Sequence, residues 1–441
     1  MTPARQSPAA GRPPGFTYGE AKRGILRRGG GYVLHCEDVA LPKLAERYGT
    51  PLYVYSAKMI RERYEAFEQA FHDVPHTLCY SVKANSNLSI LRLLARYGCG
   101  FDVVSGGELE RVLSADRKAA KRVVFSGVGK TREELVAALK AGILLFNVES
   151  ESELWALAEC AGRLRKRAPV ALRVNPDVAA ETHPYISTGL HKHKFGVPLA
   201  DAKSLYAKAS SARYLTVSGV SVHIGSQITD VAPFGEAMTR VADLVRELRA
   251  DGHRIDYVDA GGGLGIAYEK ADSADFGNCV ATYARALVTP LRGLDVRLLL
   301  EPGRSIVGAA GVLLTSVIYK KRNNGKQFLV VDAAMNDLIR PTLYHAHHEI
   351  LPLRKNAYPT IHADVVGPVC ETGDYLAKGR DLPGVLPGDF LAICTAGAYG
   401  FVQASNYNSR PRPAEVLVEG ATWRVIRERE NCEDLIRGEK L

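Results

Sequence analysis

The pattern of apolar residues predicts eight buried strands between residues 50 and 305. Each run is short and mostly apolar, as expected of a strand that is covered on both faces. Amphipathic stretches separate the runs, so the chain alternates between strand and helix. The predicted strands cover residues 77–83, 100–104, 122–126, 143–148, 169–174, 217–224, 256–260 and 297–301.

The amphipathic stretches predict helices over residues 88–97, 107–115, 151–166, 234–250 and 278–292. A further helix starts at Thr131, where Glu134 completes a capping box three residues later. Eight parallel strands that alternate with helices over about 250 residues predict an α/β fold, a (β/α)8 barrel of the TIM type. A doubly wound open sheet is the alternative, and the number of units favours closure.

Beyond residue 305 the pattern changes to short β-type runs with turn signals, which predict a separate all-β domain. These runs cover residues 311–319, 327–332, 361–366, 388–394, 414–418 and 422–425. Residues 24–36 are also β-like, so we expect an N-terminal strand to pair with this domain. The predicted domains are a disordered tail (1–20), the pairing segment (21–45), the barrel (46–305) and the C-terminal β domain (306–441).

The composition narrows the class of protein. With 441 residues, 46% hydrophobic and 24% charged, the chain is an ordinary globular protein. No apolar run reaches about 18 residues, so no membrane span is expected. The net charge of +9 is spread along the chain, which favours a small anionic ligand over nucleic acid.

The cysteines indicate the compartment. Eight of them are scattered without a C-x-x-C pair, and no histidine stands at metal-ligand spacing. This spacing argues against a disulfide framework and a metal site, and predicts a reducing cytoplasm. Residues 1–17 lack an acidic residue, so a transit peptide is the alternative to a disordered tail there.

Polar side chains stand at or just after the predicted end of every barrel strand. In a (β/α)8 barrel these ends form one rim, where active sites lie. Any single one could be a cap or loop residue, but eight consecutive strands show the pattern. Lys83 is the most informative, because a desolvated lysine can lose its proton and form a Schiff base with a carbonyl. The rim residues are Lys83, Asp102, Ser126, Asn147, Glu149, Arg173, Asn175, His223, Asp259, Glu301 and Arg304.

Glycine-rich turns after the last two strands predict a phosphate site. Residues 261–265 (GGGLG) and 301–304 (EPGR) let backbone N–H groups close around an anion, and Ser226 adds a hydroxyl. A phosphate site beside a reactive lysine suggests pyridoxal phosphate, with a sugar-phosphate aldolase as the alternative. Glu301 favours pyridoxal phosphate, because a carboxylate facing the pyridine nitrogen keeps it protonated and makes the ring an electron sink. His223 could stack on that ring or be a core histidine.

Nine motifs together resemble the fold-type III pyridoxal-phosphate decarboxylases, and most closely the diaminopimelate decarboxylases. The resemblance runs from about residue 25 to the C-terminus, and the order and spacing of the motifs make it specific. The motifs are YSVKANSN (80–87), GFDVVSGGEL (100–109), HKFGV (193–197), HIGSQ (223–227), GGGLG (261–265), EPGR (301–304), RPTLYHAHHEI (340–350), CETGD (370–374) and GAYG (397–400).

The resemblance implies an alanine-racemase-like barrel with a β domain, acting as a homodimer with active sites at the subunit interface. It implies that Lys83 holds pyridoxal 5'-phosphate as a Schiff base, that Glu301 pairs with the pyridine nitrogen and that His223 stacks on the ring. Cys370 and Glu371 would reach the active site of the partner subunit, with Cys370 as a proton donor. The implied cofactor-binding residues are Lys83, Asp102, His223, Ser226, Gly261, Gly262, Gly263, Glu301, Pro302, Gly303, Arg304 and Tyr399.

Charge favours meso-2,6-diaminopimelate as the substrate. Arg304 and Arg340 can hold its distal carboxylate and Glu371 its distal ammonium. Two arginines would repel the cationic tail of ornithine or arginine. The expected reaction removes CO2 at the D-configured centre and gives L-lysine, the last step of lysine biosynthesis. The implied substrate-binding residues are Arg304, Arg340, Tyr344, Glu371, Thr372 and Tyr399.

Several alternatives stay open at this point. The same machinery could decarboxylate arginine, ornithine or carboxynorspermidine, and alanine racemase shares the barrel. A catalytically silent regulatory homologue would have lost the lysine or the cysteine, yet Lys83 and Cys370 are both present. Thr372 stands where the family usually has serine, and we expect little change from the added methyl. His345, His347 and His348 receive no role from the sequence.

Overall fold

The computed structural model describes residues 12–20, 31–178, 194–269 and 276–441. The chain divides into two compact units. The first, here called the barrel unit, contains the described residues of 64–265 and 276–305. The second, here called the β unit, contains those of 1–63, 266–275 and 306–441.

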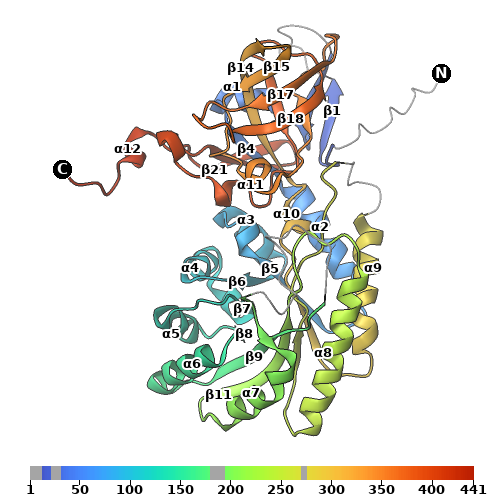
Figure 1. The fold of residues 1–441 in the computed structure, drawn as a ribbon, viewed down its shortest axis with the longest axis vertical. Coiled ribbons are helices and arrows are strands. Elements are labelled where there is room, and N and C mark those ends of the chain that lie inside the picture. Colours follow the sequence, from blue (N-terminus) through green and yellow to red (C-terminus); the bar gives the residue numbers. More distant parts are fainter. Residues whose placement is uncertain (1–11, 21–30, 179–193, 270–275) are drawn as a thin grey trace. The chain divides into compact units, whose positions relative to one another are not determined.

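Eight parallel strands close on themselves in the barrel unit, which confirms the predicted (β/α)8 barrel (Figure 1). The hydrogen-bonded order is β9-β11-β12-β13-β5-β6-β7-β8, and β8 pairs again with β9 to complete the ring. A short ninth strand, β10 (Val197–Pro198), adds to β9. The eight strands are β5 (His76–Ser81), β6 (Gly100–Val103), β7 (Val123–Phe125), β8 (Leu145–Val148), β9 (Ala168–Asn175), β11 (Leu215–Val222), β12 (Tyr257–Asp259) and β13 (Arg297–Leu300).

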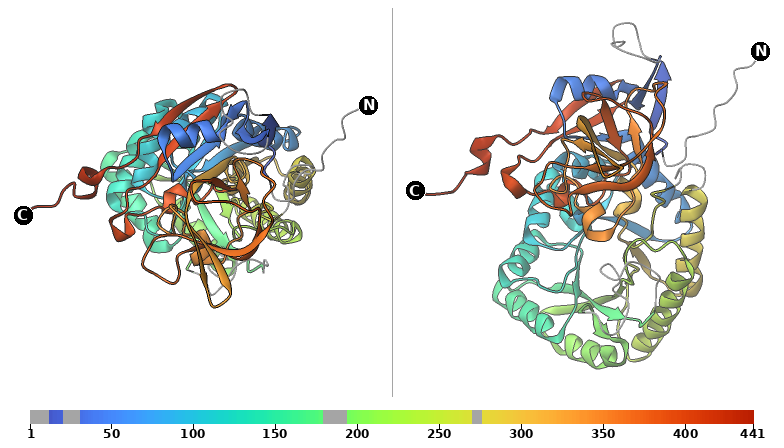
Figure 2. Two further views of the ribbon diagram at one scale, coloured as in Figure 1. Left: turned by 90° about the horizontal axis from the view of Figure 1, so that it is seen from above. Right: turned by 45° about the horizontal axis from the view of Figure 1, so that its top comes forward.

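Helices cover the outside of the barrel strands (Figures 1 and 2). The predicted capping box at the start of α5 is present, with hydrogen bonds in both directions between Thr131 and Glu134. The sequence reading missed α7, whose apolar face is weakly segregated. The helices are α3 (Leu88–Arg96), α4 (Gly106–Ala115), α5 (Arg132–Ala141), α6 (Glu151–Leu164), α7 (Leu199–Ser211), α8 (Ala232–Ala250), α9 (Phe276–Leu291) and α10 (Arg304–Val307), with the 3-10 turns η1 (Val82–Ala84) and η2 (Arg117–Arg122). α2 (Ala57–Ala70) runs from the β unit into the barrel unit.

The β unit is built mainly from antiparallel strands. Its larger sheet has the order β18-β17-β15-β14-β4-β20-β21, with β16 and β19 joined to β14 through β19, and β1, β2 and β3 form a small sheet. The strands are β1 (Phe16–Glu20), β2 (Tyr32–Cys36), β3 (Val39–Ala40), β4 (Leu52–Ser56), β14 (Gly311–Asn323), β15 (Lys326–Val331), β16 (Ile350–Pro352), β17 (Ile361–Val366), β18 (Tyr375–Leu382), β19 (Phe390–Ile393), β20 (Ala414–Glu419) and β21 (Thr422–Arg427). The helical segments are α1 (Leu41–Tyr48), α11 (Arg340–Tyr344), α12 (Cys432–Leu435), η4 (Phe401–Gln403) and η5 (Tyr407–Ser409).

The N-terminal part of the chain joins the β unit, as the sequence predicted. The backbone N–H of Leu34 in β2 donates to Leu353 O at 2.8 Å. Two details differ from the predicted ranges. Residues 16–20, expected in a disordered tail, form β1, and β4, within the range assigned to the barrel, pairs with β14 and β20. Residues 1–11 and 21–30 lie outside the described part of the chain. Within the described ranges, no helix is both long and apolar enough to cross a bilayer.

Candidate active site

The alternation of side chains along the barrel strands builds the candidate site. Five fully buried residues, one on each of five strands, form an apolar layer inside the barrel: Cys79, Val124, Leu145, Ala171 and Leu299. A strand places every second residue on the same face. The residues two positions later are therefore stacked on this layer at the carboxyl ends of the strands, and all of them are polar: Ser81, Ser126, Asn147, Arg173 and Glu301.

Lys83 is held at this rim by a buried carboxylate. The strand β5 ends at Ser81, so Lys83 lies in the 3-10 turn η1 and not on the strand as predicted. Its Nζ is 2.6 Å from Oδ2 of Asp102, which also accepts the Ser81 hydroxyl at 2.7 Å. The Lys83 side chain is 35% exposed whereas that of Asp102 is 0% exposed, so the amine is anchored yet accessible to a carbonyl compound.

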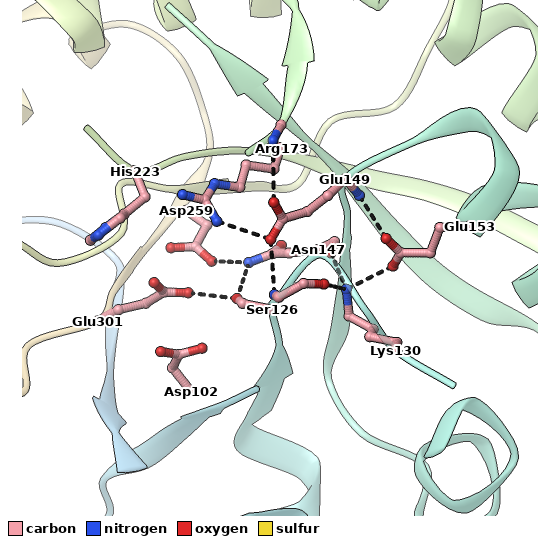
Figure 3. Close-up of polar contacts among 12 residues, drawn as sticks. Asp102, Ser126, Lys130, Asn147, Glu149, Glu153, Arg173, His223, Asp259 and Glu301 are labelled. Carbon is pink, nitrogen blue, oxygen red and sulfur yellow. Dashed lines mark hydrogen bonds and ion pairs between the residues drawn. The ribbon is translucent and has the colours of Figure 1, made fainter. Parts of the chain in front are cut away.

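Three buried carboxyl groups, Asp102, Asp259 and Glu301, dominate the electrostatics of the rim (Figure 3). Burial, together with the charges of Asp102 and Asp259, raises the pKa of Glu301 well above its ordinary range. Burial also raises the pKa of Asp259 to about 6. Asp102 Oδ1 has no hydrogen-bond partner among the described residues. The rim therefore has spare acceptors and a surplus of acid groups, which suits a positively charged partner.

Ser126 and Asn147 fix the orientation of two of these carboxyl groups. The Ser126 hydroxyl donates to Glu301 Oε1 at 3.1 Å. The Asn147 amide donates to Ser126 Oγ at 3.1 Å and to Asp259 Oδ2 at 2.7 Å. The sequence placed these residues on the rim without giving them a role, because their partners come from strands far apart in the chain.

A second polar network lies beside the first and includes two residues that the sequence reading missed, Lys130 and Glu153 (Figure 3). The ammonium of Lys130 is fully buried and donates to Glu153 Oε1, Gly127 O and Asn147 O at 2.7–2.8 Å. Three acceptors match its three donor hydrogens, so Lys130 is a structural cation and not a nucleophile. The only signal in the sequence is a lysine in the loop after the third strand, which is too common to single out.

Glu149 and Arg173 extend this second network. Arg173 Nη1 donates to Glu149 Oε1 at 2.9 Å, and the same oxygen accepts the backbone N–H of Gly127 at 2.9 Å. The backbone N–H of Gly196 donates to the other oxygen of Glu149 at 3.2 Å. These bonds tie the loop after β7 and the start of β10 to the strands β8 and β9.

The glycine-rich turns bring three backbone segments into close approach. A Cβ at Gly262 would lie 2.1 Å from Glu301 O, and one at Gly263, whose φ is +111°, would lie 2.4 Å from Gly225 O. A Cβ at Gly303 would lie 2.9 Å from Ser81 Cβ, while Ser81 N donates to Pro302 O at 3.1 Å. Only glycine fits at these positions. The turns thus expose backbone rather than side chains, as an anion cradle requires.

Ser226, Arg304 and His223 border the same turns. Arg304 Nη2 donates to Ser226 Oγ at 3.0 Å, so a cation and a hydroxyl lie together. The backbone N–H of Gly262 donates to His223 Nδ1 at 3.2 Å, which leaves that nitrogen without a proton. Burial, followed by the charges of Arg173 and Lys83, lowers the pKa of His223 well below its ordinary value. His223 is therefore a neutral, flat ring.

The β unit contains the remaining predicted residues. Arg340, at the start of α11, is 5% exposed, and its guanidinium lies 4.4 Å from the ring centroid of Tyr268. The hydroxyl of Tyr344, at the end of α11, accepts a hydrogen bond from Gln403 at 3.5 Å. Tyr399 adopts a positive φ of 54°, which is uncommon outside glycine and occurs at functional sites.

The segment Cys370–Thr372 is exposed on the surface of the β unit. Asn408 Oδ1 accepts the backbone N–H of Cys370 at 3.0 Å, and Tyr407 donates its hydroxyl to Glu371 Oε2 at 2.8 Å. These hydrogen bonds hold an exposed segment in a defined position.

The comparisons with known proteins all indicate the same family. Residues 57–308 match the family described as pyridoxal-dependent decarboxylase, pyridoxal binding domain. The chain is similar to diaminopimelate decarboxylase from Pseudomonas aeruginosa, with 52% identity over 408 residues that cover 92% of this chain and 97% of the relative. It is similar to the enzyme of that name from Vibrio cholerae, with 50% identity over 403 residues, 91% of this chain and 95% of the relative. The crystal structure of diaminopimelate decarboxylase from Helicobacter pylori complexed with L-lysine has a TM-score of 0.86 and 44% identity, and covers 90% of this chain and 98% of that one.

Proposed function

We infer the function from one premise: the chain belongs to the diaminopimelate decarboxylase family of pyridoxal-dependent decarboxylases. It is a carboxy-lyase that converts meso-2,6-diaminopimelate to L-lysine and CO2, the last step of lysine biosynthesis. The observation that supports this most directly is the barrel rim, where Lys83 lies among three buried carboxyl groups.

The residues of the rim fit pyridoxal 5'-phosphate. Its ring nitrogen needs an acid partner, and Glu301 is a buried acid with a raised pKa. Its phosphate needs backbone N–H groups and a hydroxyl, which the backbone of Gly263 and Gly303 and the side chain of Ser226 would supply. When bound, the cofactor supplies a ring that accepts the electron pair left by the departing CO2.

The side chains of the rim have separate roles in this proposal. Lys83 would hold the cofactor through its side-chain nitrogen, which Asp102 keeps oriented. Glu301 holds a proton at the ring nitrogen, and the hydroxyl of Ser126 fixes that carboxyl group. His223 would lie against one face of the ring and, being neutral, would add no charge that competes with the ring nitrogen.

The distal end of the substrate is read by residues of opposite charge. Arg304 and Arg340 bind the distal carboxylate and Glu371 binds the distal ammonium, with Tyr344, Thr372 and Tyr399 as further contacts. A carboxylate on the substrate offsets the burial of an arginine side chain, whereas a second ammonium would not.

The enzyme acts as a homodimer in the cytoplasm. Cys370 and Glu371 of one subunit complete the active site of the other, and Cys370 donates the proton that replaces the carboxyl group. The exposure of both residues supports this assignment. The eight free cysteines support a reducing compartment.

The test is a substrate panel with the purified, cofactor-loaded protein. Release of CO2 and formation of L-lysine are measured with meso-diaminopimelate, arginine, ornithine and carboxynorspermidine. We expect turnover of meso-diaminopimelate at a kcat/KM at least about a hundredfold above the others, because each misplaced buried charge costs several kcal/mol. A preference for ornithine or arginine would assign the chain to a related decarboxylase, and binding of cofactor without any turnover would indicate a silent homologue.

A further inference from the structure

A buried cluster in the β unit connects Arg340 to two residues that have no role so far, His348 and Tyr268. Arg340 Nη1 lies 2.8 Å from His348 Nε2. The guanidinium lies 4.4 Å from the ring centroid of Tyr268. The two rings are 5.4 Å apart with an interplanar angle of 75°, so they meet edge to face. Arg340 is 5% exposed and His348 is 0% exposed.

The hydrogen bonds determine the protonation state of His348. A guanidinium has only donors, so Nε2 must accept and carries no proton. The other ring nitrogen, Nδ1, lies 2.8 Å from Cys394 O, a carbonyl that can only accept. Nδ1 therefore carries the proton. His348 is the neutral tautomer that bonds to Arg340 on one side and to the backbone of the Cys394 segment on the other.

A neutral acceptor has a specific advantage for a substrate-binding arginine. A carboxylate in this place would hold the guanidinium equally well but would neutralise its charge. Imidazole accepts one N–H of the guanidinium and adds no negative charge beside it. The face of Tyr268 stabilises a cation in the same way, without an opposite formal charge.

We propose that His348 is a positioning residue for substrate specificity: through Nε2 it orients Arg340, with Tyr268 stacked on the guanidinium, to bind the distal carboxylate. This inference rests on the proposed function, since it needs Arg340 to contact the distal head of the substrate. Neither His348 nor Tyr268 touches the reacting atoms, so both act on discrimination between ligands rather than on the chemical step.

The experiment compares two competitive inhibitors of the cofactor-loaded enzyme. L-Lysine, the product, retains the distal amino-acid head, and cadaverine is the same molecule without the carboxylate. The ratio of their inhibition constants measures recognition of the carboxylate alone. His348→Leu removes the acceptor at similar size, and we expect it to lower this ratio about tenfold or more, as for loss of a hydrogen bond to a charged group. Affinity for cadaverine should change less than about threefold.

Matched variants separate positioning from a general structural role. His348→Gln keeps an acceptor for Arg340 and a donor for Cys394 O, so its ratio should stay within about threefold of the wild type. His347→Ala changes a neighbour that is 25% exposed and pairs with Glu349, so it should leave the ratio unchanged. Tyr268→Leu alters a partly exposed side chain and tests the same cluster if His348→Leu does not fold. A ratio in His348→Gln as low as in Arg340→Ala, or an unchanged ratio in Tyr268→Leu, would overturn the proposal.

Arg340→Ala in the same assay identifies which assignment fails. If Arg340→Ala leaves the ratio at the wild-type value, Arg340 does not read the carboxylate and that part of the proposed function is wrong. If Arg340→Ala lowers the ratio but His348→Leu folds and does not, the proposed function stands and His348 is not the positioning residue.

Discussion

The barrel rim and the Arg340 cluster bury groups of opposite charge: the rim buries acids and the cluster buries a cation. The rim gathers three carboxyl groups, Asp102, Asp259 and Glu301, and one of them has an oxygen with no hydrogen-bond partner among the described residues. The cluster buries one cation, Arg340, beside a neutral histidine and an aromatic ring. Burying a charge without compensation costs several kcal/mol, so acids and cations buried in different regions suit ligand groups of opposite charge. In the proposed function the rim receives the cationic ring nitrogen and Arg340 receives a carboxylate.

The two regions also differ in how they hold their key side chain. Ser126 and Asn147 fix the rim carboxyls by donating to them, and His348 fixes Arg340 by accepting from it. In both regions an uncharged side chain orients the acidic or cationic group.

The largest effect is expected from Lys83→Ala. Without the amine, the cofactor has no covalent attachment, so turnover should fall by on the order of a thousandfold or more and the visible absorbance of the bound cofactor should disappear. Both are measured on purified protein. Lys58→Ala is the control, because that side chain is 60% exposed and forms a surface ion pair with Glu62. Absorbance near the wild-type level in Lys83→Ala would contradict the assignment.

Glu301→Gln should reduce kcat by on the order of a hundredfold while the protein stays folded. The amide matches the shape of the carboxyl group and can still accept from Ser126, but it cannot share an acidic proton with the ring nitrogen. Steady-state kinetics with meso-diaminopimelate provide the measurement. Ser126→Ala should have a smaller effect, about tenfold, because it only orients the acid. Equal effects would mean that geometry rather than acidity is what Glu301 contributes.

Arg340→Ala should raise KM for meso-diaminopimelate about tenfold to a hundredfold and leave cofactor affinity nearly unchanged, since its target is the distal carboxylate. KM from steady-state kinetics and the dissociation constant of the cofactor from absorbance titration are compared. Losing both to the same extent would show that Arg340 is structural.

The smallest effect concerns the pH dependence of stability. Burial raises the pKa of Glu108, next to the rim, from 4.5 to about 7. Because the folded state favours the protonated acid, this stability is fully present below about pH 4.5 and is lost as the pH rises through about 7. The free energy of unfolding of the cofactor-free protein should thus fall by about 1–3 kcal/mol from this group between those limits.

Glu108→Gln removes this titration, so its unfolding free energy should fall less steeply between pH 5 and pH 8 than that of the wild type. Denaturant titrations at several pH values measure the slope. Glu110→Gln, an exposed site on the same helix α4, is the control and should follow the wild type. Identical slopes for Glu108→Gln and the wild type would show that the titration of Glu108 does not affect the free energy of unfolding.

Local patterns in the sequence were sufficient for most of the barrel and its rim. Short, mostly apolar runs identify the strands, and the polar residue at the end of a run, such as Glu301, identifies the rim. Such local patterns do not show which strands pair, or which side chains meet, when they lie far apart in the chain. The strand β4 was missed because its partners β14 and β20 follow more than 250 residues later in the chain. For the same reason the sequence could not connect Asn147 with Asp259, or Arg340 with Tyr268.

The turn after β5 marks another limit. A run of apolar residues continues through Val82, so the sequence placed Lys83 on the strand, but the chain turns after Ser81. The burial of Lys130 likewise could not be predicted locally, because two of its three acceptors, Asn147 O and Glu153 Oε1, lie 17 and 23 residues later in the chain.

The covalent link between Lys83 and the cofactor can be examined directly. Sodium borohydride is added to the cofactor-loaded protein, and the digested peptides are analysed by mass spectrometry. We expect the mass of the reduced cofactor on the peptide that contains Lys83 and none on the peptide that contains Lys130. A label on Lys130 or on any other lysine, or bound cofactor with no covalent label, would contradict it.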